Sequence, residues 1–199
     1  MRKFFVSNYK KCWDFLNESR WFFVFAFGLF VLTFLIGFAY PVFFRAEIFE
    51  MLRDLILRFE GKGVVEMIGL IFLNNLWASF MAMVAGVLLG VFPLFTCIVN
   101  GYLLGFVARE AVLMDGIFVM WKILPHGIFE LPAVLFSIGI GLRLGAEVVN
   151  SGWLMVNGEK GEGSVGYVFR EGVRFFVFVV FPLLVVAGVV EGILIGFAN

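Results

Sequence analysis

The sequence predicts an all-α protein, a polytopic membrane helical bundle of about five spans that forms a single integral membrane domain over residues 1–199. Three observations predict this class. Hydrophobic residues make up 62% of the chain, the mean hydropathy is +1.04, and several apolar runs are long enough to cross a bilayer. So apolar a chain cannot cover itself with polar surface in water. We expect it in the lipid bilayer of the cell membrane.

Charge and cysteine content exclude several classes of function. The formal net charge is zero, so nucleic acid is not expected as a partner. Cys12 and Cys97 provide neither a disulfide framework nor the spacing of metal ligands, and we expect no metal and no cofactor. The chain contains no glutamine, which fits the depletion of thermolabile amides in thermophilic organisms.

The first twenty residues predict a basic amphipathic helix. Residues 1–20 contain five Lys and Arg residues against two acidic ones, and their apolar residues recur at helical spacing. Such a segment rests on the anionic cytoplasmic leaflet; the alternative is a frayed tail whose charges only set the orientation. The apolar run from Trp21 to Tyr40 is about 30 Å long as a helix, which matches the hydrocarbon core and predicts the first span.

A second amphipathic stretch follows the first span. Residues 45–60 place apolar side chains on one helical face and most charges on the other. They predict an interfacial helix, which either rests on the membrane or serves as a docking site for a partner. Gly61 and Gly63 end it.

The middle of the chain predicts a helical hairpin. The 42 residues from 67 to 108 contain no charge, and one helix of that length would be roughly twice as long as the hydrocarbon core is thick. The run must therefore fold back, as helices over 68–91 and 94–112 with the turn marked by Pro93. Residues 111–124 are too short and too polar to cross, so we expect them to lie at the interface or to dip in and return.

A fourth span is expected from Pro125 or Pro132 to Val149. Arg143 and Glu147 lie one helical turn apart in this span. We expect them to pair with each other near the inner membrane surface.

The last part of the chain predicts a polar connection and a fifth span. Residues 150–174 form a glycine-rich polar loop, and its sequence GEKGEGS lacks the lysine and hydroxyl pair of a phosphate-binding loop. Residues 175–198 form the fifth span, kinked at Pro182. Five spans place the N-terminus in the cytoplasm, with nine Lys and Arg residues on that side against six on the other.

Glycines recur four residues apart inside the proposed spans. Such stripes let helix backbones approach closely, as in the GxxxG motif, and predict a compact bundle. These glycine stripes serve helix contacts either within one chain or between two copies of the chain. We expect a homodimer. The pairs are Gly86/Gly90, Gly101/Gly105, Gly141/Gly145, Gly188/Gly192 and Gly192/Gly196.

The sequence ILPHGIFELP, residues 123–132, contains the chain's single histidine and an intramembrane glutamate between two prolines. Pro125 suits the first position of a helix. Pro132 removes one hydrogen bond and crowds the carbonyl of Ile128, so we expect 125–132 to be a broken or re-entrant segment before the fourth span. A helix can be broken inside a membrane only where protein groups or water form hydrogen bonds with the backbone N–H and C=O groups that the break leaves unpaired.

Four polar residues are candidates for a functional core. His126 and Glu130 either form a buried hydrogen bond that locks the segment to its neighbours or belong to a proton or ion path. A zinc site is the weakest alternative, because one histidine and scattered carboxylates fall short of three ligands. Asn74 and Asn100 stand inside apolar spans, where such residues either join helices or line a pathway.

These residues carry a resemblance that covers nearly the whole chain. The sequence LPHGIFELPAVLFSIGIGLRLG, preceded by FLNN and NGYLLG, resembles the stage II sporulation protein M family. The resemblance rests on Pro125, His126, Gly127, Glu130 and Pro132, with Asn74, Asn100 and Gly101 in support.

This resemblance implies a five-span protein without a known catalytic residue or cofactor. In spore formers, it implies membership of a membrane complex that recruits peptidoglycan hydrolases during engulfment. Members also occur in organisms without spores, including archaea. With the missing glutamine, we expect a non-sporulating, archaeal or thermophilic source.

Two functions remain. The first is a non-enzymatic scaffold, or a component of a membrane protein complex, whose amphipathic segments hold other membrane or cell-envelope proteins. The second is a small ion or proton channel or transporter with a polar cavity lined by Asn74, Asn100, His126 and Glu130. An intramembrane hydrolase is less favoured, because no nucleophile has an assignable base in the sequence.

Overall fold

The computed structural model describes residues 2–59, 61–157 and 164–198. Within these ranges the regular elements are helices and no strand occurs. Five helices are long and apolar enough to cross a membrane, which confirms an all-α bundle of five spans. The helical stretches that contain these spans are Arg2–Ala39, Val64–Val87, Val91–Asp115, Gly127–Val156 and Val165–Glu191.

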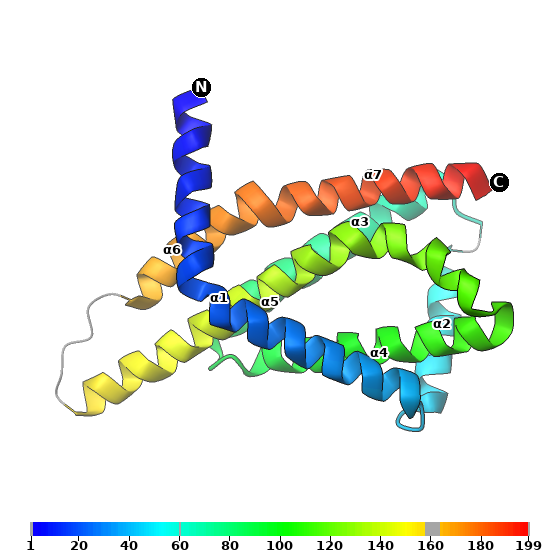
Figure 1. Ribbon diagram of the computed structural model, residues 1–199, viewed down its shortest axis with the longest axis horizontal. Coiled ribbons are helices and arrows are strands. Elements are labelled where there is room, and N and C mark those ends of the chain that lie inside the picture. Colours follow the sequence, from blue (N-terminus) through cyan, green and yellow to red (C-terminus); the bar gives the residue numbers. More distant parts are fainter. Residues whose placement is uncertain (1, 60, 158–163, 199) are drawn as a thin grey trace.

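Two amphipathic segments lie across the ends of the bundle (Figure 1). The first is residues 2–20 of α1 (Arg2–Ala39), which we call the arm. The second is α2 (Arg45–Phe59), at the opposite end. The spanning helices run lengthwise between these two ends, which we call the arm end and the α2 end.

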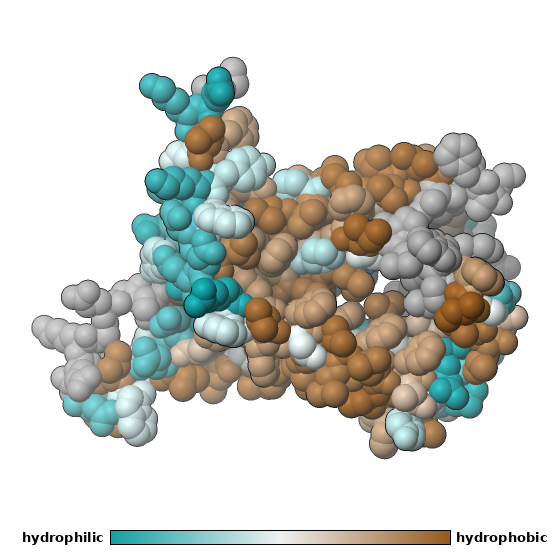
Figure 2. Space-filling view, in the orientation of Figure 1, coloured by the Kyte–Doolittle hydropathy of each residue, from teal (hydrophilic) through white to brown (hydrophobic). Residues whose placement is uncertain are grey.

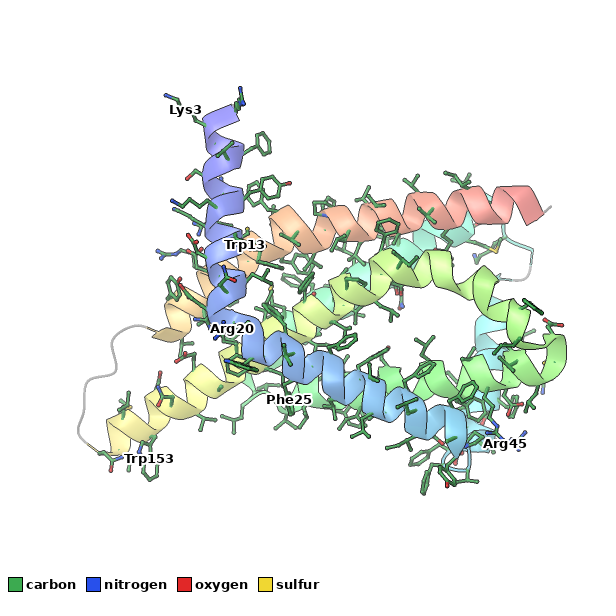
Figure 3. All side chains as sticks on the ribbon, viewed as in Figure 1. Lys3, Trp13, Arg20, Phe25, Arg45 and Trp153 are labelled. Carbon is green, nitrogen blue, oxygen red and sulfur yellow. The ribbon has the colours of Figure 1, made fainter. Side chains whose placement is uncertain are left out.

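The arm is a helix rather than a frayed tail, and it is continuous with the first span. Helix α1 bends near Arg20, as Figure 3 shows. Cys12, Phe15 and Ser19 bury one face of the arm, whereas hydrophilic residues cover the side that points away from the bundle (Figure 2). The arm thus has the two faces of an interfacial helix.

Helix α2 forms where an amphipathic helix was predicted. It contacts α4 (Val91–Asp115) through an aromatic pair, in which the ring centroids of Phe49 and Phe106 are 5.5 Å apart. Arg45 forms an ion pair with Glu110 of α4 at 3.4 Å. These contacts keep α2 across the end of the bundle.

The connection between α1 and α2 is held by two side chains of α4. The hydroxyl of Tyr102 accepts a hydrogen bond from the amide of Phe43 at 3.0 Å and donates one to its carbonyl at 2.9 Å. Arg109 donates to the carbonyl of Phe38 at 2.8 Å. The last carbonyls of a helix have no partner inside it, so Arg109 satisfies the C-terminal end of α1.

Helices α3 (Val64–Val84) and α4 form the predicted hairpin, but the turn is displaced. The chain reverses at Leu89 and Gly90, which have φ values of 58° and 74°. Pro93, expected at the turn, lies in the first turn of α4, where a missing amide hydrogen breaks no helical bond.

The expectation of a broken segment at 125–132 is wrong. Helix α5 (Met120–Val156) runs unbroken through both prolines and curves over its first part (Figure 1). The break before the fourth span lies at Gly116, which ends α4 with a φ of 78°. A proline removes only one helical bond and bends the helix, whereas glycine readily takes the left-handed conformation that ends one.

The expectation of a loop over 150–174 is also wrong for the residues that the structure describes. Helix α5 continues to Val156, and α6 (Ser164–Phe175) follows, while residues 158–163 lie outside the described ranges. The glycines here suggested a loop, yet Gly172 is a packing residue. A Cβ at this position would lie 2.7 Å from Cγ2 of Ile140.

Helix α6 continues into α7 (Phe181–Ala198) through a π-helical turn, Phe176–Val180. The amide of Phe181 bonds to the carbonyl of Phe176, five residues back. This turn lies directly before Pro182, where a kink was expected. Proline has no amide hydrogen and crowds the carbonyl four residues earlier, so a locally wider helix relieves the conflict.

Glycines allow the closest helix contacts. A Cβ at Gly101 of α4 would lie 2.8 Å from the carbonyl oxygen of Phe30, and one at Gly105 would collide with the carbonyl of Phe34. Gly141 of α5 faces the backbone of α3 in the same way. Backbones this close gain dispersion contacts that lipid tails do not replace.

Replacing Gly105 by Leu is expected to destabilise the protein by about 1–3 kcal/mol, because the new side chain must push α1 away from α4. Thermal unfolding in detergent measures the effect. Gly69→Leu on α3 is the matched control, since no atom lies within 4 Å of a Cβ built there. Equal unfolding temperatures for the two variants would contradict this account of the α1–α4 contact.

Candidate functional site

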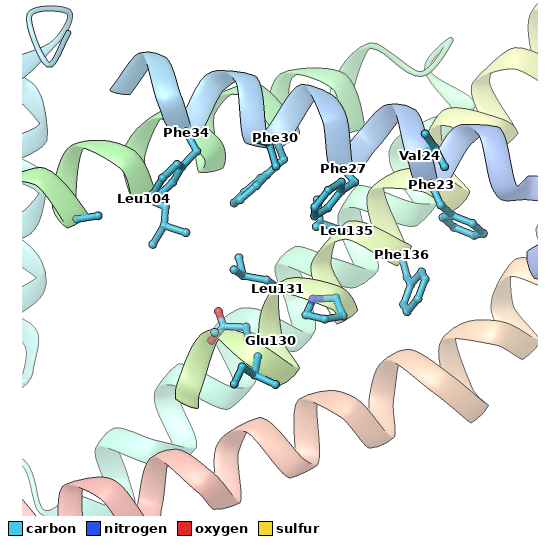
Figure 4. A pocket seen from close by; sticks show the side chains of 15 residues that line it. Phe23, Val24, Phe27, Phe30, Phe34, Leu104, Glu130, Leu131, Leu135 and Phe136 are labelled. Atoms are coloured by element: carbon cyan, nitrogen blue, oxygen red, sulfur yellow. The ribbon is translucent and has the colours of Figure 1, made fainter. Parts of the chain in front are cut away.

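Residues from Gly127 to Pro132 form part of the wall of a cavity of about 800 Å³. The cavity lies between α1, α4 and α5 (Figure 4). Gly127, Glu130 and Pro132 contribute to the wall from α5. The other lining residues are Phe23, Val24, Phe27, Phe30, Val31, Phe34, Leu104, Ala108, Ile128, Leu131, Leu135 and Phe136.

The wall of this cavity is apolar apart from one carboxyl group. Glu130 is the charged residue among the lining residues, and its Oε2 atom is buried. A carboxyl at this depth of a membrane is costly and is retained for a structural or functional reason. The cavity therefore combines a hydrocarbon-like interior with a single polar group in its wall.

The cavity opens toward the side of the protein that faces lipid. Val24 and Phe27 line it and also belong to the outer surface of α1, where they are 58% and 60% exposed. Figure 2 shows the surface hollowed between α1 and α5. A molecule in the bilayer can thus reach the cavity without crossing a polar surface.

The structure describes only the backbone at Pro125 and His126. Both residues lie in the helical part of α5, with His126 about one turn before Glu130. Their side chains lie outside the described residues, so the predicted His126–Glu130 hydrogen bond, the proton path and the zinc site all remain predictions.

The structure does not gather the predicted polar residues at one place. Asn74 is exposed on α3, and Asn100 is exposed on α4, where its Nδ2 atom donates to the carbonyl of Thr96 at 2.8 Å. Neither asparagine lines the cavity that contains Glu130. Gly101 is buried where α4 contacts α1.

A second site lies where the arm meets the bundle. Arg143 of α5, only 9% exposed, donates to the hydroxyl of Ser19 at 2.5 Å and to the carboxylate of Glu18 at 3.2 Å. Tyr167 of α6 donates to the same carboxylate at 3.1 Å. We call Glu18, Ser19, Arg143 and Tyr167 the arm anchor. Arg143 thus pairs with the arm, and the expected pairing with Glu147 is wrong.

Two further features surround the arm anchor. The guanidinium of Arg143 lies over the ring of Phe15, 4.7 Å from its centroid, which adds a cation–π contact. Helix α6 carries an ion pair between Glu171 and Arg174, and Glu171 is only 7% exposed. Buried charges are tolerated when each has a partner, and the loss of one partner leaves the other uncompensated.

The sequence indicated that Arg143 needs a polar partner, but it did not indicate which residues are its partners. An arginine inside a long apolar span requires a partner, because an unpaired charge there is costly. The hydrogen bond from Arg143 to Ser19 joins residues 124 positions apart. No local pattern identifies a partner at that separation.

Two nucleophilic side chains inside the spans make only main-chain hydrogen bonds in the described structure. Ser137 donates to the carbonyl of Ala133 at 3.0 Å, and the thiol of Cys97 donates to the carbonyl of Ala26 at 3.3 Å. These bonds occupy the protons that a general base would have to remove. Such hydrogen bonds to main-chain carbonyls are common for Ser and Cys side chains inside helices.

Comparison with known proteins gives one family and one relative. The model of the family described as Stage II sporulation protein M matches residues 21–194. The chain is also 33% identical over 106 residues to an uncharacterized protein of Methanocaldococcus jannaschii, which supports the expected archaeal affinity. That alignment covers 53% of this chain and 46% of the relative, so it spans just under half of the relative's length. No solved structure matches the chain.

Replacing Arg143 by Met is expected to loosen the arm and to lower stability by about 1–3 kcal/mol, because charge-assisted hydrogen bonds are lost while the apolar stem is retained. Trypsin should then cleave after Lys10 and Lys11 faster than in the wild type. Arg170→Met is the control: its side chain is 69% exposed and pairs with Glu171 at 3.4 Å, a contact of small energy. Equal cleavage rates in the two variants would show that Arg143 does not hold the arm.

Proposed function

Because the chain belongs to the Stage II sporulation protein M family, we propose that it is a non-enzymatic, multi-pass protein of the cell membrane. In this proposal it acts as a scaffold within a membrane protein complex, whose other members are membrane or cell-envelope proteins. The family match begins at Trp21, directly after the arm. The matched region therefore supplies the membrane body, and we assign partner binding to the arm.

The observation that carries this proposal is the way the arm is held. The arm anchor attaches it at its base, and the ring of Phe178 lies 6.3 Å from Phe5 and 5.9 Å from Tyr9 nearer its tip. Its apolar edge faces the membrane, and its polar stripe faces water. The exposed residues of this stripe are Lys3, Lys10, Lys11, Asp14 and Asn17. A stripe in a fixed position gives a partner a pre-organised surface, which lowers the entropy lost on binding.

We place the arm end, and with it the N-terminus, in the cytoplasm. The arm, the end of α5 and the start of α6 all lie at the arm end (Figure 1). Nine of the fifteen Lys and Arg residues of the sequence are assigned to this side by a five-span topology. An excess of Lys and Arg marks the cytoplasmic side of a membrane protein.

The cavity supports a scaffold rather than a channel or transporter. Ion pathways are lined by carbonyls, charged rings or polar groups that replace water around the ion. Among the lining residues of this cavity, only Glu130 is charged and the others are apolar or glycine. Asn74 and Asn100, which the channel hypothesis requires in the pathway, lie elsewhere.

A photo-crosslinking residue at Asn17 tests the partner surface. In cells that contain the full complex, it should form one adduct with a partner protein, and the double change Lys10→Glu, Lys11→Glu should abolish that adduct by reversing the charge of the stripe. Arg53→Glu, an exposed position on α2, is the control and should leave the adduct unchanged. An adduct that survives the double change would exclude this stripe as the partner surface.

Ion flux tests the non-enzymatic scaffold against the channel. Purified protein in liposomes should conduct neither protons nor small ions, and Glu130→Gln should behave like the wild type, because an apolar cavity offers ions no replacement for water. A flux that Glu130→Gln abolishes would instead establish a pathway through the motif.

The proposal includes a homodimer. Light scattering on the same preparation should give the mass of two chains.

A further inference from the structure

The cavity exists because the first part of α5 curves away from α1. In its second half α5 packs tightly on α1, where a Cβ at Gly139 would collide with the ring of Phe23. Toward Pro132 and Pro125 the helix curves, and the space between α5 and α1 opens (Figure 1). Protein interiors rarely contain voids larger than a water molecule. An apolar space of about 800 Å³ beside a bilayer therefore requires an occupant.

The depth of the cavity points to an occupant from the hydrocarbon core. Phe27 and Phe34 line the cavity and lie about 9 Å and 20 Å along the helix from Trp21, at about 1.5 Å per residue. Both positions fall inside a hydrocarbon core of about 30 Å. Water does not fill an apolar cavity, because it finds too few hydrogen-bond partners there.

The size of the cavity favours a narrow occupant over a helix from a partner or a second copy. A helix with its side chains is about 10–12 Å wide, so a volume of about 800 Å³ would hold only about 7–10 Å of its length, or fewer than two turns. A span needs about 30 Å. An occupant that is narrower and more flexible than a helix fits this space better.

We infer that the cavity between α1, α4 and α5 binds a hydrocarbon chain of a membrane lipid. The chain enters past Val24 and Phe27, which are exposed to the bilayer, and lies against Leu131 and Leu135 of α5. A lipid chain is apolar along its length, as the wall is. This binding site goes beyond the scaffold proposal and does not depend on it.

The inference also gives the 125–132 motif a physical role. The prolines curve α5, which makes the space, and Gly127 keeps the wall free of a side chain. A Cβ at Gly127 would meet only Leu131, at 3.5 Å and beyond. The described residues of the motif thus shape the wall of a lipid site.

A photoreactive lipid tests this site. The full chain is placed in nanodiscs containing a phospholipid with a diazirine in its acyl chain, irradiated, and mapped by mass spectrometry. Labels should concentrate on lining residues, Phe27, Leu131 and Leu135 in particular. Gly127→Leu, which places a side chain in the cavity, should lower this labelling about tenfold, the effect of excluding roughly two methylene groups from burial.

Two further variants keep the result interpretable. Gly28→Leu adds the same side chain on the lipid-facing surface of α1, where nothing lies within 4 Å of the Cβ, and it should label like the wild type. Val31→Trp narrows the cavity from the opposite wall and should also lower labelling. This variant tests the site even if Gly127→Leu fails to fold. If Gly127→Leu or Val31→Trp folds and the lining residues are labelled as in the wild type, the labels come from general contact with surrounding lipid. Adducts joining two chains through lining residues would mean that a second copy occupies the space; either result overturns the inference.

Discussion

The close packing of α5 is the constraint on which the rest of the structure depends. Helix α5 contacts α1, α3, α4, α6 and α7. In a bilayer, apolar side chains gain little by exchanging lipid for another helix, so contacts must come from close backbone approach. Gly141 and Gly145 provide that approach in the second half of α5. The first half has no comparable stripe and curves away, which creates both a tight core and an open cavity along one helix.

The same helix also controls the position of the arm. Arg143 lies two residues before Gly145, in the closely packed half of α5, and reaches the base of the arm through Glu18 and Ser19. Its charge costs free energy to bury, and that cost is offset only while these partners stay in place. The arm is therefore tied to the position of α5. A scaffold benefits from this arrangement, because a partner then binds a surface that the membrane body orients.

The residues that carry the family resemblance act through shape as well as polarity. Pro125, Gly127 and Pro132 are residues whose main effect is on backbone geometry and space. In the structure they lie on the curved part of α5, and Gly127 and Pro132 line the cavity. Glu130 adds the one charged group to that wall. This arrangement gives the described residues of the motif a structural role, because they shape the wall of the cavity.

The sequence by itself determined the class of the protein, its five spans and the helix α2, because these follow from the length of apolar runs and from helical periodicity. Only the tertiary structure decided that the arm continues into the first span, that the backbone breaks at Gly116, and that Gly172 of α6 packs on α5. It also decided that Arg143 pairs with the arm while Asn74 and Asn100 face outward. The reason is physical: an apolar run limits how a short segment crosses the membrane, but the partner of a buried charge is chosen by the packing of helices that are distant in the chain.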